Sequence, residues 1–96
     1  MVAPLLTVLM DDGAVHEIQA TNADLVAEEL DRFKKHRPGP NEAQITWMTW
    51  IAWHGLRREG IIAGELTFDA FVRLCVSIGP TELVETDPSP PVPETG

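Results

Sequence analysis

Histidine and cysteine are the residues of this chain best able to bind a metal or to act as a base or nucleophile. The sequence contains His16, His36, His54 and a single cysteine, Cys75. The histidines are widely separated, and none has a cysteine or carboxylate partner at the spacing of zinc ligands. Cys75 lies among apolar residues, which is typical of a buried, unreactive thiol. We therefore expect no enzyme activity, no metal site and no cofactor.

Serine nucleophiles and phosphate-binding loops are not indicated either. Ser77 and Ser89 have no general base near them in the sequence, and a serine nucleophile needs one. Gly60 and Gly64 are expected at a helix end and in a loop rather than around a phosphate. The basic run 34–37 is interpreted as a solvated helix C-terminus, where positive charge interacts favourably with the helix dipole.

The residues best suited to binding lie in one predicted helix, which runs from about Glu42 to Glu59, capped by Asn41 and ended by Gly60. One side of its helical wheel is aliphatic, with Ile45, Met48, Ile51, Ala52 and Leu56. The opposite side holds the candidate partner-binding residues Trp47, Trp50, Trp53, His54 and Arg57. Trp and Arg together are typical of binding hot spots. The alternative is that the tryptophans pack under a neighbouring hairpin, because aromatic residues also dominate cores.

That hairpin is predicted from two β-prone stretches, 5–10 and 14–20, on either side of Asp11-Asp12-Gly13. A three-residue loop, with Gly13 left-handed, gathers the apolar residues on one face, and a two-residue loop would mix apolar and polar side chains. The gathered residues are Leu6, Val8, Met10, Ala14, Ile18 and Ala20. Two strands alone are marginal in water, so helices must cover this ribbon.

Two further helices are expected. The first spans about Ala23 to His36, is capped by Thr21 or Asn22, and contains the acid-first pairs Glu28 with Arg32 and Asp31 with Lys35. An apolar stripe at helical spacing, of the kind that usually packs on a core, consists of Leu25, Val26, Leu30 and Phe33. The last helix spans about Phe68 to Ile78, with Thr67 as N-cap and Gly79-Pro80 at its end. Its expected buried stripe is Phe68, Phe71, Val72, Cys75 and Ile78.

The sequence therefore predicts an α+β fold, mainly α, in which an N-terminal β-hairpin packs on three helices. The domain is expected to span residues 1–80, followed by a flexible, acidic, Pro-rich tail over 81–96 that folding does not require.

A net charge of −8 argues against nucleic acid and anionic membranes as partners. A lone cysteine, with no basic signal region and no membrane-spanning run, favours the cytoplasm.

Several of these features, in this order, resemble the tail assembly chaperones of long-tailed phages that infect actinobacteria. The resemblance covers about Thr7 to Ile78: an Asp-Gly hairpin and an Asn-x-Asp step at 22–24, then Ala-Trp-His-x-Leu-Arg-Arg at 52–58. A Leu-Thr-Phe-Asp-x-Phe helix start follows at 66–71. The resemblance implies a protein without catalytic residues that binds the tape measure protein, keeps it soluble and helps tail tube protein to assemble around it. Many such proteins are made in a short form and a frameshifted longer form, and a product that ends in a Pro-rich acidic tail resembles the short form.

The aromatic side of the predicted helix over 42–59 also predicts homo-oligomers in the host cytoplasm, because an exposed aromatic patch favours self-association. Two other functions stay open at this point. A structural head-tail connector or tail completion protein would remain in the virion as a ring. A small regulatory DNA-binding domain has helices of this size, but its binding surface would normally be basic.

Overall fold

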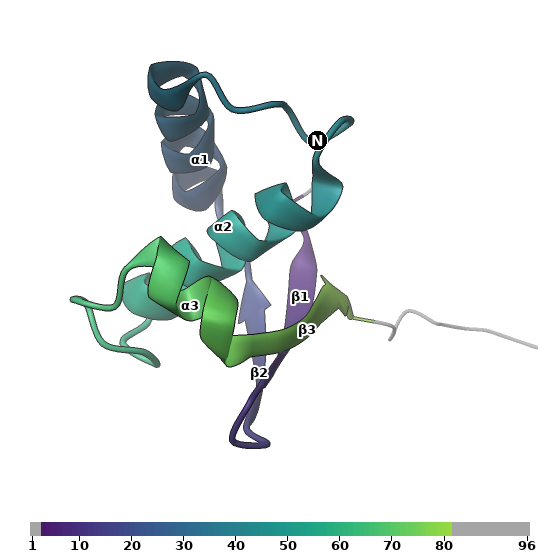
Figure 1. Cartoon of the computed structure of the whole chain (residues 1–96), viewed down its shortest axis with the longest axis vertical. Helices are drawn as coiled ribbons and strands as arrows, with labels where there is room; N and C mark the ends of the chain where they lie inside the picture. The colour runs from purple at the N-terminus through teal and green to yellow at the C-terminus, as the bar shows by residue number, and fades with distance from the viewer. Residues whose placement is uncertain (1–2, 82–96) are drawn as a thin grey trace, which may run out of the picture.

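The part of the chain that the structure describes, residues 3–81, contains three strands and three helices (Figure 1). It is described from a computed structural model. The elements are β1 (Leu5–Met10), β2 (Val15–Gln19), α1 (Asn22–Lys35), α2 (Gln44–Arg58), α3 (Phe68–Leu74) and β3 (Cys75–Pro80). The strands form one antiparallel sheet in the order β2-β1-β3. The α+β class is confirmed, but the expected hairpin is part of a three-stranded sheet.

The β1–β2 hairpin has the loop that the alternation of side chains predicted. Leu9 is opposite Val15, and the Met10 N–H donates to the Ala14 carbonyl at 2.8 Å, so the loop is 11–13. Gly13 has a φ of 90°, which is accessible at little cost only to glycine. Every second residue of β1 is therefore buried, and the predicted register is confirmed.

The core lies between one face of this sheet and the helices α2 and α3. Its fully or nearly buried apolar residues come from both layers: Leu6, Val8, Met10, Ile18, Ala20, Met48, Ile51, Ala52, Leu56 and Phe71. Figure 1 shows α2 crossing the middle of the molecule, with α1 above it and α3 in front, and α2 contacts every other element. Because α2 joins the sheet to α1 and α3, it positions the side chains that converge between the helices.

The segment after α3 contradicts the expected helix over 68–78. Thr67 caps α3 as predicted, through a hydrogen bond from the Ala70 N–H, but the helix ends at Leu74. Residues Cys75–Pro80 instead form β3, which pairs with the free edge of β1. Val76 and Ile78 are β-branched and fit a pleated strand well. The pairing also gives hydrogen-bond partners to the second edge of β1. A helix at 75–80 would leave that edge without partners.

Helix α1 contradicts the expectation that its apolar stripe packs on a core. The buried residues of this helix are Asp24 and Glu28, whereas Val26, Leu30 and Phe33 are exposed. The two predicted i,i+4 ion pairs are confirmed, Glu28 with Arg32 and Asp31 with Lys35. Thr21 caps the helix, with Asp24 completing a capping box. The inward acids have two sources of positive charge: His54 and Arg58 of α2 face Asp24, whereas Arg32 of α1 and Arg37 just after it face Glu28.

Helix α2 begins at Gln44, two residues after the predicted start at Glu42. Its N-cap is Ala43, which provides no side-chain hydrogen bond, so the predicted capping role of Asn41 is wrong. Gly60, with a φ of 73°, follows its C-terminus as expected. Among the aliphatic residues of its wheel, Ile45 is exposed and the other four are buried.

The sheet pairing continues one residue beyond the expected domain boundary at 80. The Thr81 N–H donates to the Leu5 carbonyl at 2.8 Å, and the Thr81 and Thr7 hydroxyls lie 2.6 Å apart. The tail predicted over 81–96 otherwise lies outside the described residues. None of the helices within residues 3–81 is long and apolar enough to cross a membrane.

Candidate functional site

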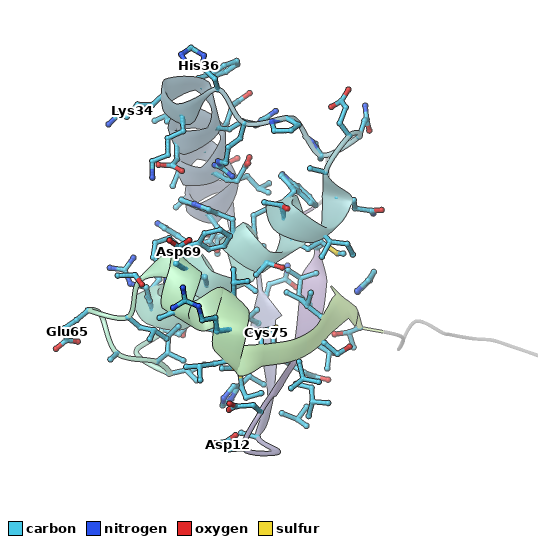
Figure 2. All side chains as sticks on the ribbon, viewed as in Figure 1. Asp12, Lys34, His36, Glu65, Asp69 and Cys75 are labelled. Atoms are coloured by element: carbon cyan, nitrogen blue, oxygen red, sulfur yellow. The ribbon has the colours of Figure 1, made fainter. Side chains whose placement is uncertain are left out.

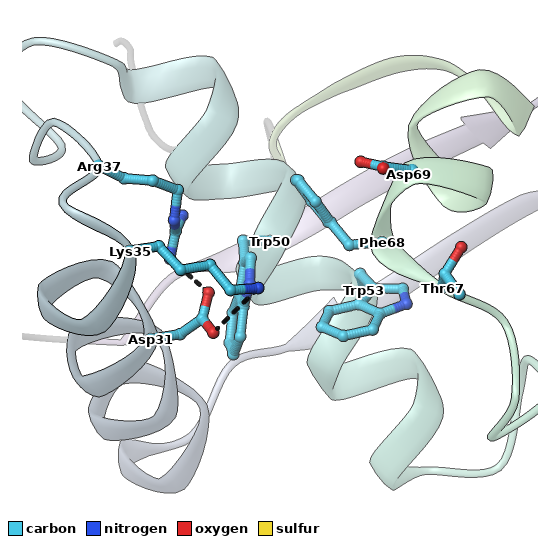
Figure 3. A pocket seen from close by; sticks show the side chains of 8 residues that line it. All are labelled: Asp31, Lys35, Arg37, Trp50, Trp53, Thr67, Phe68 and Asp69. Carbon is cyan, nitrogen blue, oxygen red and sulfur yellow. Dashed lines mark hydrogen bonds and ion pairs between the residues drawn. The ribbon is translucent and has the colours of Figure 1, made fainter.

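A groove runs between α1, α2 and α3, and most of the candidate binding residues line it. It consists of two cavities that share Asp31, Trp50 and Trp53, and we call them together the helix groove. The first has a volume of about 410 Å³ and is lined by Asp31, Lys35, Arg37, Trp50, Trp53, Thr67, Phe68 and Asp69 (Figure 3). The second, of about 330 Å³, is lined by Ala27, Leu30, Asp31, Lys34, Trp50, Trp53, His54 and Arg57.

Three aromatic rings form the floor of the helix groove. Trp50 and Trp53 meet edge to face, with ring centroids 5.3 Å apart. Trp53 meets Phe68 of α3 in the same manner at 5.7 Å. These spacings lie within the preferred range for aromatic pairs, which stabilise a fold beyond the area that they bury. The floor is therefore a rigid apolar surface shared by two helices.

Trp50 is buried, with 7 % of its surface exposed, so of the two possibilities left open for the tryptophans it packs inside the fold. His54 stacks on its ring at a centroid distance of 5.3 Å, and the Arg37 guanidinium lies 5.9 Å from the ring centre. Arg37 follows the C-terminal end of α1. The ring is thus enclosed by α2 and by the turn that leaves α1, and it contributes to holding the two together.

Trp53 and Arg57 fasten the loop between α2 and α3. The Trp53 indole N–H donates to the Leu66 carbonyl at 2.8 Å. The Arg57 guanidinium lies 4.5 Å from the Trp53 ring centre and donates twice to the Gly64 carbonyl, at 3.0 and 2.6 Å. Both side chains are half-buried, so each keeps a surface towards the groove while it holds this loop in place.

An ionic cluster behind the floor joins α1 to α2. The fully buried carboxylate of Asp24 lies 2.6 Å from Nδ1 of His54 and accepts hydrogen bonds from Nε and Nη2 of Arg58, at 3.2 and 3.0 Å. It also accepts from the Thr21 N–H at 2.9 Å. Burial raises the pKa of Asp24, but the hydrogen bonds from Arg58, His54 and Thr21 lower it by more. Asp24 therefore remains charged and orients His54.

Glycine allows α2 to approach the sheet closely beside this cluster. A Cβ atom at Gly55 would lie 2.8 Å from Cγ1 of Ile18 in β2 and 3.4 Å from the Asp24 carboxylate. The first distance is shorter than packed carbon atoms tolerate. Gly55 thus keeps His54 and Arg58 within reach of Asp24.

The rim of the helix groove is charged, with Lys34 and Lys35 exposed and Asp31 and Arg37 half-buried. Asp31 forms ion pairs with Arg37 at 3.0 Å and Lys35 at 3.5 Å, both drawn in Figure 3. Lys34 extends into solvent at the end of α1, as Figure 2 shows, and Leu30 is exposed nearby. An aromatic floor within a charged rim is the usual composition of a protein-binding surface.

The structure brings together four of the five predicted site residues. Trp50, Trp53, His54 and Arg57 line the helix groove. Trp47 does not, because it lies in a separate cavity beside Pro40 and the Leu25 side of α1. The sequence-based prediction missed Leu30, Asp31 and Phe68 as groove residues. Leu30 and Phe68 stood out as apolar stripe residues, but the stripes were expected to face the core.

Within residues 3–81, no group of three His, Cys, Asp or Glu side chains is arranged to hold a metal ion. Burial raises the pKa of the Cys75 thiol, which disfavours its reactive thiolate form.

No protein-family model, curated protein or solved structure matches this chain. The functional interpretation therefore depends on the residues themselves and on their arrangement.

Proposed function

We propose that this chain is a tail assembly chaperone of a long-tailed phage, a non-catalytic module that binds the tape measure protein. The helix groove is the observation that carries this proposal. A tape measure protein is long, helical and apolar before the tail tube encloses it, and an amphipathic helix is commonly bound by laying its apolar side into a groove. Trp53 and Phe68, with Leu30 beside them, are suited to that contact, and the buried Trp50 supports Trp53 from beneath.

The arrangement of the motif residues supports the same proposal. Asp24 of the Asn-x-Asp step bonds to His54 and Arg58 of the second motif. Trp53 of the second motif bonds to Leu66 and packs on Phe68 of the third. The segments that carry the resemblance are thus far apart in sequence and adjacent in space, which is expected if together they build one binding surface.

The remaining parts of the proposal follow from charge and from the resemblance. The chaperone acts in the cytoplasm of the bacterial host, as a homo-oligomer, and also assists the tail tube protein. Nucleic acid and membranes are not its partners. A net charge of −8 opposes unlimited aggregation of the complex and favours release of the client.

The proposal is tested by co-expressing the chain with the tape measure protein of the same phage. The chain should increase the soluble amount of tape measure protein and co-purify with it. Leu30→Glu, which puts a charge on the groove, should weaken co-purification by about tenfold or more, because a charge against an apolar client is costly. Leu30 is 65 % exposed, so the fold should survive, which a melting curve checks.

Phe33→Glu is the matched control. Phe33 is on the same helix and 67 % exposed, but it does not line the helix groove. It should bind the client normally. Equal loss in both variants would contradict the groove as the binding site. Mass spectrometry of purified virions tests the alternative function. A chain retained in the virion at a fixed copy number would indicate a head-tail connector or completion protein instead of a chaperone.

A further inference from the structure

Strand β3 is an edge of the sheet, and part of its backbone has no partner within residues 3–81. The order β2-β1-β3 leaves one side of β3 free. The Thr81 N–H bonds to Leu5, and the pairing of Gly79 with Thr7 and of Ser77 with Leu9 continues that register. In an antiparallel pair, alternate residues direct their main-chain groups to the partner strand. The N–H and C=O of Ile78 therefore point away from β1.

An uncharged groove lies beside this edge, on the helix side of the sheet. Its volume is about 330 Å³, and it is lined by Ile45, Thr49, Val72, Cys75, Val76, Ser77 and Ile78. Three of these are exposed large apolar residues from three elements: Ile45 of α2, Val72 of α3 and Val76 of β3. We call this set the edge patch. Free strand groups beside exposed apolar side chains are the features of a surface that pairs with another chain.

The opposite edge of the sheet is protected. The carbonyl of Gln19 at the end of β2 accepts a hydrogen bond from Nη2 of Arg58 at 3.3 Å. Glu17, in the middle of β2, is exposed and charged. Charged side chains at an edge oppose pairing with a further strand. The β2 edge also has an outward N–H at Glu17, but its charge and the bonded Gln19 carbonyl make it less suited to extension than the uncharged β3 edge.

We propose that two copies of this chain join antiparallel through β3, about a two-fold axis perpendicular to the sheet, to form a continuous six-stranded sheet. This rests on the homo-oligomer part of the proposed function and assigns its surface. An antiparallel arrangement about that axis keeps the helices of both copies on the same side, so the two edge patches meet. The Ile78 N–H of each copy then finds a carbonyl acceptor on the β3 edge of the other.

A second copy fits this edge better than an unrelated extended segment does. A second copy brings its own edge patch together with the outward N–H and C=O of Ile78, whereas a lone extended segment brings main-chain groups without side chains from two helices. Pro80 has no N–H, and an irregularity interrupts the register beside Met10. The paired stretch is therefore short, and burial of the edge patches must provide most of the affinity. Because the charge of Glu17 disfavours pairing at the β2 edges that a dimer leaves outermost, we expect association to stop at two copies.

The first test is the molar mass of the full chain in solution, measured by light scattering over a wide range of concentrations. The chain should form dimers, and added salt should strengthen them because it screens the repulsion between two acidic chains. Val76→Glu should weaken dimerisation by roughly tenfold or more. Val15→Glu is the matched control: Val15 lies in the other edge strand and is 61 % exposed, against 62 % for Val76. Both variants change the net charge equally, and the control should still dimerise.

Amide hydrogen exchange tests the pairing without any substitution. The Ile78 N–H should exchange more slowly as the concentration rises and dimers form. The Glu17 N–H, which the register of β1 with β2 directs to the other edge, should exchange at the same rate throughout.

A chain that stays monomeric, or dimers that Val76→Glu leaves intact, would overturn the inference while leaving client binding at the helix groove unaffected. Loss of client binding in Val76→Glu without a change in mass would assign the edge to the client and would also overturn it.

Discussion

Asp24 and Glu28 lie one turn apart on α1 and are both buried, yet their carboxylates have opposite surroundings. Asp24 accepts hydrogen bonds from two elements, and its pKa is lowered below 3.8 despite burial. One oxygen of Glu28, Oε1, has no hydrogen-bond partner among residues 3–81. Burial raises its pKa above 4.5, and Arg32 and Arg37 lower it only in part. Ionised Asp24 therefore stabilises the fold, and ionised Glu28 destabilises it.

The sign of each shift gives a pH dependence. Asp24 has a lower pKa when folded, so its contribution to stability is present above 3.8 and is lost as the pH falls through the folded value. Asp24→Asn should reduce the free energy of unfolding at neutral pH by about 3 kcal/mol, because Arg58 and His54 lose a buried partner. Urea unfolding at a series of pH values should show the deficit shrinking below pH 3.8.

Glu28→Gln should behave in the opposite way. Glu28 has a raised pKa when folded, so its charge destabilises the fold above that pKa; the penalty shrinks as the pH falls through the folded pKa and is absent below 4.5. The substitution should therefore change the free energy of unfolding at neutral pH by no more than about 1 kcal/mol, or increase it. The same urea series measures it. A loss as large as that of Asp24→Asn would mean that the pairs with Arg32 and Arg37 outweigh burial.

At the scale of elements, the sequence predicts what local patterns determine. The alternation of apolar residues and Gly13 fix the β1–β2 loop without reference to anything distant. The face of α1 is not predictable in this way, because Asp24 is turned inward by Arg58, which follows it 34 residues later. Likewise, Cys75–Pro80 fits a short helical stripe or a strand, and the free edge of β1 decides between them.

The helix caps give a prediction at this scale. The Thr21 hydroxyl accepts a hydrogen bond from the Asp24 N–H, and the Thr21 N–H donates to the Asp24 carboxylate. Thr21→Ala should therefore lower the free energy of unfolding by about 1 kcal/mol. Asn41→Ala should have little effect, because Asn41 is exposed and α2 begins without a side-chain cap. Thermal unfolding of the two variants makes the comparison, and a larger loss from Asn41→Ala would place the cap of α2 at that residue.

At the scale of the whole molecule, the candidate site was predictable as far as one helix defines it. Four of the five proposed residues share a groove because their i, i+3, i+4, i+7 spacing places them on one side of α2. Their neighbours were not predictable, because a helical wheel gives directions and not what lies in them. Trp50 is buried by the turn after α1, and Trp47 is directed to a different cavity. The groove is therefore a property of the assembled fold rather than of α2 alone.

The place where the fold ends can be tested by a graded series of truncations. A chain ending at Thr81 keeps every hydrogen bond between β1 and β3. Its free energy of unfolding should lie within about 1 kcal/mol of that of the full chain, as the acidic, Pro-rich composition beyond it suggests. Ending at Pro80 removes the Thr81 bond to Leu5 and the hydroxyl contact with Thr7, which should cost about 1 kcal/mol more.

Ending the chain at Leu74 should have a different outcome, because it removes β3 entirely. The remaining β1–β2 pair would be a two-stranded ribbon, which is marginal in water, and Val8 would lose its cross-strand neighbour Ile78. Circular dichroism and urea titration should then show no cooperative unfolding transition. A cooperative, stable chain ending at Leu74 would mean that α2 and α3 hold the hairpin without β3, and β3 would then be dispensable for the fold as well as free to pair.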